Sequence, residues 1–477
     1  MDRKKILYAL CSTYKILNDK YYGTIKLSKL ACYFIDSPIF QRLRSLKQLG
    51  LASYVFPSAN HTRFEHSIGT YHLSKKLIEQ LKTNSDINNL NKCLTDIVEL
   101  QQYFSIDGNI LLDYYISELI NISALCHDLG HGPYSHLYDD VILKNNEHIK
   151  QLVSNNIHLH NLLQHEYRST LLLRQIVKNN DILNTLITDD EISFMSRIIN
   201  PHKDTDISYI FQIVSNPIND LDVDKFDYLT RDTCYVGCNY KFNPNRFIEF
   251  AKVIDNNICY LKQLDSDIIN VFTLRHFMHR HIYNHKTIIS IQYIFTKLLS
   301  YLQEELNLYE WVEHNDITLF YKLTDEYINV MLRNSTNLKI KELLYNLDIR
   351  NINPLIHVST IETSDTYNIH FKTQQEFLNS HINKLYIFTN IIGFVTGDKP
   401  NPLNNIFLYS AKHDSKSFKL LNGNHTIMIP KFHQEQLIMI YYIKQYDKEL
   451  DDKLIKLFES NIIISKCSDS IDSNCNE

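Results

Sequence analysis

The stretch Ala124-Leu-Cys-His127-Asp128-Leu-Gly130-His131-Gly-Pro-Tyr-Ser-His136 ends an apolar segment with an adjacent His-Asp pair, then a glycine-rich turn and two further histidines. A neutral imidazole and a carboxylate bind a divalent cation well, and glycines let the backbone approach a bound phosphate closely. A single His-Asp pair is more often a helix-capping or surface pair than a metal site. The interpretation therefore depends on whether the chain supplies further ligands.

Two other segments carry side chains of the same kind. Arg63-Phe-Glu-His66 lies upstream, and Asp222-Val-Asp224-Lys225-Phe-Asp227-Tyr228 lies downstream. A histidine such as His66 is by itself more often a satisfied core residue, but the three segments together favour a metal-binding role. Two imidazoles and two carboxylates suit Mg, Mn, Fe or Zn, and the sequence does not choose among them. The predicted metal ligands are His66, His127, Asp128 and Asp224.

Leu- and Ile-rich stretches of helical period, such as residues 73–81 and 288–302, alternate with short Asn- and Asp-rich breaks. After about residue 310, β-branched and aromatic runs such as 384–395 indicate strands. We therefore expect a mainly α fold with a smaller α+β part. The expected divisions are a helical core with an N-terminal regulatory segment over residues 1–310, an α+β lobe over 311–464 and a disordered tail over 465–477.

The bulk composition excludes several classes of protein. A chain of 477 residues with 44% hydrophobic residues can bury a large core, and 49 basic against 54 acidic residues give a net charge of −5. This balance gives no electrostatic reason to coat nucleic acid, which is therefore not expected as the main ligand.

The nine cysteines are irregularly spaced, and we interpret them as reduced thiols. No segment has the character of a signal peptide, and the longest apolar run, Leu385 to Val395, falls short of the ~20 residues that span a bilayer. We expect an intracellular protein, cytoplasmic or nuclear, without a membrane anchor.

The three metal-ligand segments, in this order, resemble the HD superfamily and, more closely, the SAM-and-HD-domain deoxynucleoside triphosphate (dNTP) triphosphohydrolases. The resemblance also covers residues 15–19, 36–44 and 275–286, with a weaker likeness at 429–437, and we expect no SAM domain before it. It implies an HD-domain helical phosphohydrolase core. The implied reaction splits a dNTP into a deoxynucleoside and inorganic triphosphate with the help of a divalent metal ion.

The resemblance also implies which residues take part in the reaction. Protonation of the leaving 5′-oxygen needs an acid near the metal, and the acid itself must be oriented. The implied catalytic residues are His131, His136 and His165, with Asp139 and Glu166 as the carboxylates that orient them.

Substrate contacts follow from the same resemblance. The triphosphate needs cationic donors, and a rigid wall beside the deoxyribose excludes a 2′-hydroxyl. On a helix, side chains at steps of four project from one face, as Arg275, His279 and Tyr283 would. The implied phosphate contacts are Arg63, Lys225, Arg275 and His131, the implied sugar and pocket contacts are Gln48, Leu49, Tyr228, Asp232, His279 and Tyr283, and Asn284 is the candidate base-edge contact.

In the family that the chain resembles, nucleotides bound between subunits build the active oligomer. We therefore expect a homo-oligomer, dimer or tetramer, with GTP or dGTP as activator. The residues that match the first activator site are Lys15, Ile16, Asp36, Gln41 and Arg44, and those that match the second are Asn18, Val55, Phe56, Arg246, His285, Lys286 and Arg350. Pro354 stands where the family has a lysine and residues 256–266 are shortened, so constitutive assembly stays open.

Two other classes of function stay open. A nuclease or nucleotidase of HD type would share the metal ligands, but the segment around Arg275 fits a triphosphate and the acidic net charge does not suit nonspecific nucleic-acid binding. A non-catalytic nucleotide sensor would be expected to lack a metal ligand, whereas this chain retains all four.

Overall fold

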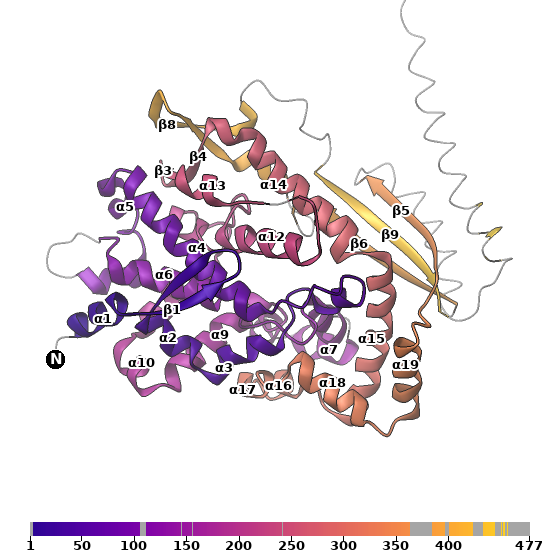
Figure 1. Ribbon diagram of the computed structural model, residues 1–477. Coiled ribbons are helices and arrows are strands. Elements are labelled where there is room, and N and C mark those ends of the chain that lie inside the picture. Colours follow the sequence, from indigo (N-terminus) through magenta and orange to yellow (C-terminus); the bar gives the residue numbers. More distant parts are fainter. Residues whose placement is uncertain are drawn as a thin grey trace, which may run out of the picture.

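The computed structural model describes residues 3–104, 111–144, 146–154, 156–240, 242–362, 384–395, 400–422 and 433–443, and the positions 450, 452, 453 and 456. Helices make up most of these residues, and short strands form small sheets at the periphery (Figure 1). The expectation of a mainly α fold with a smaller α+β part is confirmed. The tail expected over residues 465–477 lies outside the described residues.

Three helices form the centre of the fold, namely α4 (Arg63–Asn84), α6 (Tyr114–Cys126) and α12 (Val223–Tyr235). α4 packs against both of the others. Its start is fixed by a capping box, in which the backbone N–H of Thr62 donates to Glu65 Oε1 at 3.0 Å. Gly69 allows the close approach of α12, because a Cβ at this position would lie 1.9 Å from Asp227 Oδ1.

A small antiparallel hairpin leads into this helical centre. It follows α1 (Arg3–Ser12) and consists of β1 (Tyr14–Asp19) and β2 (Gly23–Ser28), with Asp19 opposite Gly23. Gly23 has a φ of +66°, which glycine adopts without strain. The chain then continues through α2 (Lys29–Ile35), α3 (Pro38–Gln41) and the 3₁₀ turns η1 (Arg42–Ser45) and η2 (Gly50–Tyr54).

The remaining helices surround the centre. Before α12 they are α5 (Ile87–Lys92), η3 (Val98–Phe104), the π-helix η4 (Tyr138–Lys144), α7 (Glu147–Ser154), α8 (Ile157–Asn161), α9 (His165–Lys178), α10 (Asp181–Leu186), α11 (Asp189–Ile199) and η5 (Tyr209–Gln212). After it they are α13 (Asn245–Glu249), η6 (Lys262–Leu264), α14 (Asp265–Met278), the π-helix η7 (His279–Tyr283), α15 (Lys286–Glu305), α16 (Glu310–Glu313), α17 (Ile317–Phe320), α18 (Asp325–Asn334) and α19 (Leu338–Asp348).

Helices from beyond residue 310 pack on the main core. Trp311, Phe320 and Ile328 are buried in the same hydrophobic cluster as the apolar residues of α4 and α6. The division of the chain at residue 310 stays a prediction.

The strands after α12 form two sheets. The first has the order β3 (Lys252–Ile254), β4 (Asn257–Leu261), β7 (Phe407–Ser410) and β8 (His413–Lys419), and β4 and β7 are parallel. The second is antiparallel, with β9 (Gln434–Tyr442) between β5 (Leu355–Glu362) and β6 (Leu385–Gly393). The short turns η9 (Pro402–Asn405) and η10 (Leu420–Asn422) flank the first sheet.

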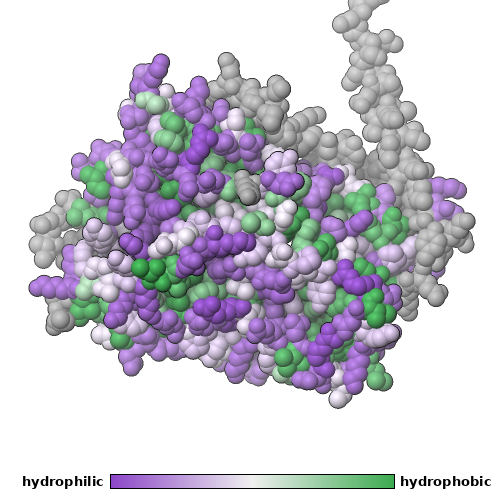
Figure 2. Space-filling model, in the orientation of Figure 1, coloured by the Kyte–Doolittle hydropathy of each residue, from purple (hydrophilic) through white to green (hydrophobic). Residues whose placement is uncertain are grey.

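The face of the molecule in Figure 2 carries mainly hydrophilic residues, with hydrophobic ones in small separate groups. Among the described residues, none of the helices combines the length and apolar character that a membrane crossing requires.

Candidate active site

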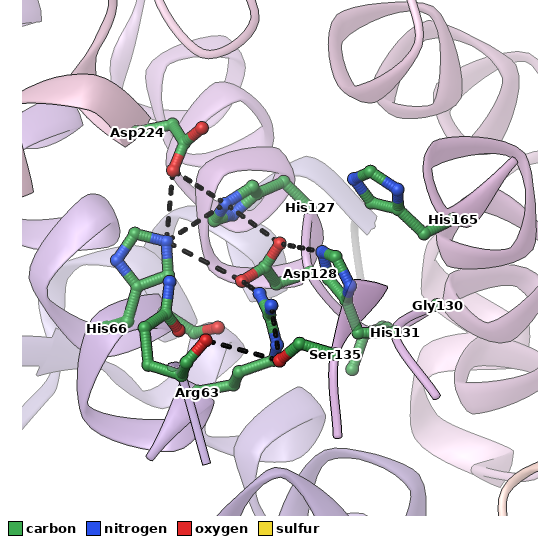
Figure 3. A network of polar contacts seen from close by, with 12 residues as sticks. Arg63, His66, His127, Asp128, Gly130, His131, Ser135, His165 and Asp224 are labelled. Atoms are coloured by element: carbon green, nitrogen blue, oxygen red, sulfur yellow. Dashed lines mark hydrogen bonds and ion pairs between the residues drawn. The ribbon is translucent and has the colours of Figure 1, made fainter. Parts of the chain in front are cut away.

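The four predicted metal ligands converge at one point between the central helices (Figure 3). His66 comes from α4, His127 and Asp128 follow α6, and Asp224 lies in the first turn of α12. His66 Nε2 lies 3.0 Å from Asp224 Oδ1, 3.3 Å from His127 Nε2 and 3.6 Å from Asp128 Oδ2. His127 Nε2 lies 3.4 Å from both Asp224 Oδ1 and Asp128 Oδ1. Segments that are far apart in sequence thus form one cluster of ligand atoms.

The Nδ1 atoms of His66 and His127, which face away from the cluster of ligand atoms, are both hydrogen-bonded to acceptors. The Nδ1–H of His127 donates to the carbonyl of Ala124 at 2.8 Å, and that of His66 donates to Asp227 Oδ2 at 2.8 Å. When both imidazoles are neutral, these bonds leave a lone pair on each Nε2 atom, and the two atoms are only 3.3 Å apart. A cation between them would relieve the repulsion of the lone pairs, so the donor set fits a divalent metal.

The pKa of His66 also indicates a site that favours positive charge. Burial by itself would lower its pKa, but hydrogen bonds with Asp224 and Asp227 raise the pKa to about 10. The cluster therefore attracts positive charge strongly at the position where the ligand atoms meet.

Asp227 anchors a second layer of contacts behind His66. Its carboxylate also accepts from Arg231 Nε at 2.7 Å and from the Tyr22 hydroxyl at 2.8 Å, and Arg231 Nη2 donates to Asp19 at 2.9 Å. Burial would raise the pKa of Asp227, but Arg231 and His66 hold it below the usual range. Asp227 is not among the predicted site residues, although its position one helical turn after Asp224 was a usable signal.

The predicted catalytic histidines form a second cluster beside the first. His131, His136, Asp139 and His165 each offer one ligand-type atom, all within 4.8 Å of one another. The rings of His131 and His165 stack with centroids 3.9 Å apart. His165 Nδ1 lies 3.4 Å from Glu166 Oε2 and 4.0 Å from Asp139 Oδ2, so both predicted carboxylates reach it.

His131 connects the two clusters. Its Nε2 lies 3.2 Å from Asp128 Oδ1. Burial lowers its pKa well below the usual value, and the charges of Arg63 and His165 lower it further. His131 is therefore neutral at neutral pH and can act as a hydrogen-bond partner beside the metal ligands.

Buried polar groups hold the glycine-rich loop that carries these residues. Arg168 of α9 donates to the carbonyl of Gly130 at 2.8 Å and to Asp139, and Arg42 donates to the carbonyls of Leu129 and His131. A Cβ at Gly130 would lie 2.0 Å from the carbonyl oxygen of His165, so only glycine fits.

Asp325 of α18 fixes the far end of the same loop. Its carboxylate accepts from the backbone N–H of Tyr134 at 2.7 Å and of Lys47 at 3.0 Å. Tyr134 and Ser135 both have left-handed φ values, 57° and 59°, which are costly for residues other than glycine. The sequence carried no signal for Asp325, because the residue lies about 190 positions downstream of the loop.

The predicted phosphate contacts lie around the two clusters. Arg63 donates to Asp128 Oδ2 at 2.5 Å and to Ser135 Oγ at 2.9 Å. Lys225 donates to the carbonyl of Asp220 and Arg275 to that of Gly393. Burial lowers the pKa of His279, and the charges of Arg275, His136 and Lys225 lower it further. The charges of Arg275, His136 and Lys225, which come from different segments of the chain, therefore all act on the imidazole of His279.

The helix expected over Arg275, His279 and Tyr283 is regular only up to Met278, because residues 279–283 form the π-turn η7. His279 and Tyr283 still lie together, with ring centroids 5.0 Å apart. π-turns are frequent at functional sites.

The predicted sugar contacts come from three segments. The Tyr283 hydroxyl donates to Asp232 Oδ2 at 2.7 Å. The backbone N–H of Gln48 donates to the carbonyl of His61 at 2.9 Å, and Leu49 packs with the cluster of Ala52, Val55 and Phe56. Tyr228 is near Arg275 and Asp224, whose charges act on its hydroxyl.

The candidate base-edge residue already uses both ends of its amide. Asn284 Nδ2 donates to the carbonyl of His279 at 2.8 Å, and Asn284 Oδ1 accepts from Asn390 at 3.1 Å. Its contact with a base stays a prediction.

The residues predicted for the first activator site gather at the protein surface. Lys15 Nζ lies 3.0 Å from Asp36 Oδ2, with both side chains about two-thirds exposed, and Arg44 Nε donates to Gln41 Oε1 at 2.8 Å. Ile16 of β1 is also exposed.

The residues predicted for the second activator site are more scattered. The rings of Phe56 and His285 lie 5.8 Å apart, next to Val55 and to Lys286 at the start of α15. Asn18 lies in β1, Arg246 pairs with Asp267 at 2.6 Å, and Arg350 follows α19 with a φ of 61°. In this single chain the structure brings only part of this set together.

Comparison with known proteins identifies relatives along nearly the whole chain. No family model matches it. An HD domain-containing protein of Acanthamoeba polyphaga mimivirus is 34% identical over 451 residues, which cover 90% of this chain and 92% of the relative. A Dictyostelium discoideum homolog of the deoxynucleoside triphosphate triphosphohydrolase SAMHD1 is 29% identical over 447 residues, covering 91% and 78%. The human deoxynucleoside triphosphate triphosphohydrolase SAMHD1 is 28% identical over 507 residues, covering 94% and 75%. The chain therefore belongs to the SAMHD1-like family of HD-domain proteins.

Proposed function

We propose that this protein is a metal-dependent dNTP triphosphohydrolase that releases a deoxynucleoside and inorganic triphosphate. The observation that supports this most strongly is that the Nε2 atoms of His66 and His127 lie 3.0–3.6 Å from each other and from the carboxylates of Asp128 and Asp224, beside a cluster of three histidines. The names of the SAMHD1 relatives supply the substrate class.

A divalent ion held by these four side chains would lower the pKa of a water molecule and polarise a phosphoryl oxygen. The chain's own residues would supply the proton transfers. His136 and His165 are the candidates to protonate the leaving 5′-oxygen, because both lie next to His131, which contacts Asp128, and because the carboxylates of Glu166 and Asp139 lie 3.4 and 4.0 Å from His165 Nδ1. Mg, Mn, Fe and Zn all suit the ligand set.

Arg63, Lys225 and Arg275 would balance the charge of the triphosphate, and the neutral His131 would contact it as a hydrogen-bond partner. Gln48, Leu49, Tyr228, Asp232, His279 and Tyr283 would form the deoxyribose side of the pocket, with Asn284 near the base. The hydrogen bond between Tyr283 and Asp232 gives this wall the rigidity that exclusion of a 2′-hydroxyl requires.

Regulation by nucleotides belongs to the same proposal. The grouping of Lys15, Ile16, Asp36, Gln41 and Arg44 at the surface supports a site for GTP or dGTP between subunits of a homo-oligomer. Asn18, Val55, Phe56, Arg246, His285, Lys286 and Arg350 are the candidates for the second activator site. An intracellular location, cytoplasmic or nuclear, would fit a protein that acts on nucleotide pools.

The test is incubation with each dNTP and Mg²⁺ or Mn²⁺, followed by ion exchange that separates triphosphate from orthophosphate. We expect triphosphate from the wild type and none from a His127→Ala/Asp128→Ala variant, which should also lose bound metal. The chain offers a matched control, since His413 and Asp414 are also adjacent but lie exposed on β8. The variant with both of these changed to alanine should keep full activity.

The reaction products also distinguish the proposed activity from the alternative functions. Orthophosphate release or cleavage of an oligonucleotide would indicate another HD-type phosphohydrolase. Tight dNTP binding with no turnover under any metal or activator would indicate a sensor. Full activity of the His127→Ala/Asp128→Ala variant would refute the proposed metal site.

A further inference from the structure

His61 is a buried histidine in the loop before α4, and it is neither a predicted site residue nor part of the proposed mechanism. Its Nε2 lies 2.7 Å from Asp232 Oδ1, and both side chains are almost fully buried. The other oxygen of the same carboxylate accepts from the Tyr283 hydroxyl at 2.7 Å. His61 and Tyr283 thus hold Asp232 by one oxygen each, which fixes the rotation of the carboxylate.

The backbone of His61 holds a second residue of the proposed sugar pocket. Its carbonyl accepts from the N–H of Gln48 at 2.9 Å, and the neighbouring residues Lys47 and Thr62 form an isolated β-bridge. One residue therefore connects the Gln48 segment to α12. Gln48 and Asp232 are far apart in sequence, and His61 contacts both.

The imidazole is also held in orientation by an aromatic neighbour. The ring of Tyr235 stacks on His61 with centroids 4.3 Å apart and an interplanar angle of 12°. The Tyr235 hydroxyl donates to Glu65 Oε2 at 3.0 Å, which ties the stack to the first turn of α4. Stacking fixes the ring plane, and the bond to Asp232 fixes which ring nitrogen carries the hydrogen.

A core histidine that only fills space would need no such arrangement. His61 Nδ1 is buried and lacks a hydrogen-bond partner within the described part of the chain, so the polar contact that the side chain does make is directed at Asp232. Burying an imidazole for one hydrogen bond is costly, and a functional constraint on Asp232 would account for it.

We propose that His61 is a positioning residue that gives the enzyme its selectivity for a 3′-hydroxyl, acting through Asp232. The inference rests on the proposed function, in which Asp232 contacts the deoxyribose. A carboxylate whose orientation is fixed in advance accepts a hydrogen bond from a 3′-hydroxyl without a cost in side-chain entropy. A freely rotating carboxylate would lose much of this advantage, and 2′,3′-dideoxynucleotides would then compete better.

The test compares the kcat/KM values for dATP and 2′,3′-dideoxy-ATP in three variants of His61. His61→Gln places an amide N–H where Nε2 stands, His61→Asn has the same amide on a shorter side chain that falls short of Asp232, and His61→Phe keeps the aromatic stack without a donor. Gln and Asn therefore form a matched pair that differs in reach alone. Metal content and thermal unfolding of each variant show whether the fold and the metal site survive.

We expect the wild type to prefer dATP, and the preference to fall about tenfold or more in the Asn and Phe variants, the effect expected for loss of one hydrogen bond to a charged group. The Gln variant should keep most of the preference. Affinity for a non-hydrolysable analogue of each nucleotide, in which a methylene group replaces the 5′-oxygen, should show the same pattern without turnover. If the Asn and Phe variants fail to fold, the Gln variant decides, since a folded Gln variant without the preference contradicts the proposal.

An unchanged preference in folded, metal-loaded Asn or Phe variants would overturn the role of His61 while leaving the proposed function intact. Equal use of dATP and dideoxy-ATP by the wild type would also overturn it. The absence of any dNTP hydrolysis by the wild type would overturn the proposed function, and the role of His61 with it.

Discussion

Replacing Asp227 with asparagine should weaken metal binding without changing any of the four proposed ligands. Asp227 accepts the Nδ1–H of His66 at 2.8 Å, and this bond makes the opposite nitrogen a better donor to a metal. Asparagine has nearly the same shape and can still accept from His66 and Arg231 with its one oxygen. The change therefore removes the negative charge and leaves the packing intact.

The expected loss of metal affinity is moderate, because the substitution removes one supporting charge and none of the four proposed ligands. Loss of such a supporting carboxylate typically lowers metal affinity 10- to 100-fold, which is about 1.4–2.8 kcal/mol. The fold should survive, because Arg231 keeps Asp19 at 2.9 Å and Glu65 at 3.7 Å as charge partners. The Tyr22 hydroxyl, which now donates to Asp227, can rotate and accept from the new amide.

The measurement is calorimetric titration of the metal-free protein with Mn²⁺, together with metal content after dialysis at fixed free Mn²⁺. Asp348→Asn is the matched control, since Asp348 also pairs with an arginine, Arg333, at 2.6 and 2.8 Å, but at the surface. The control should bind Mn²⁺ like the wild type. A dissociation constant for Asp227→Asn within twofold of the wild-type value, in a folded protein, would refute the reasoning.

Three further predictions concern pH, sugar choice and activation. Burial, and then the charge of Lys76, lower the pKa of His72 from 6.5 to about 4. Stability that depends on neutral His72 is therefore fully present above pH 6.5 and is lost as the pH falls toward 4, and urea unfolding of His72→Gln should lack this part of the pH dependence. Tyr283→Ala removes the hydrogen bond to Asp232 at 2.7 Å and the aromatic wall of the sugar pocket. The rate of dNTP turnover should therefore fall about tenfold or more, and the ratio of dGTP to GTP hydrolysis should also fall. Equal hydrolysis of GTP and dGTP by the wild type would contradict the proposed exclusion of the 2′-hydroxyl. Asp36→Asn breaks an exposed pair with Lys15 and should leave the melting temperature unchanged. The same variant should need about tenfold more GTP for half-maximal activation and for the change in sedimentation, and an unchanged GTP response would exclude Asp36 from the activator site.

Much of the candidate metal cluster could be predicted from the sequence, because its chemistry depends on residue types that are rarely grouped by chance. His127 and Asp128 are adjacent in the chain, and His66 and Asp224 lie in segments whose order matches a known family. The helical spacing of apolar residues predicted the helices that carry or adjoin these ligands, since helix formation depends on neighbours three and four positions apart. The same local rules predicted a regular helix through His279, where packing instead produced a π-turn.

The residues that support the site could not be predicted in this way. His61, Asp325 and Arg168 act through contacts with residues up to 278 positions away, and nothing in their own neighbourhoods distinguishes them from ordinary buried polar residues. Asp227 was also not predicted, although a carboxylate one helical turn after Asp224 must lie on the same face of α12 and could have been found in this way.

The sequence by itself determined the mainly helical fold, the identity of the candidate metal ligands and the family to which the chain belongs, because these depend on local periodicity and on residue type. Only the tertiary structure decided which groups orient the candidate ligands, which carboxylate oxygen each donor reaches, and that one buried histidine contacts both Gln48 and Asp232 of the proposed substrate pocket. Those facts depend on how α4, α6 and α12 pack, and packing is set by the shapes of side chains brought together from distant parts of the chain.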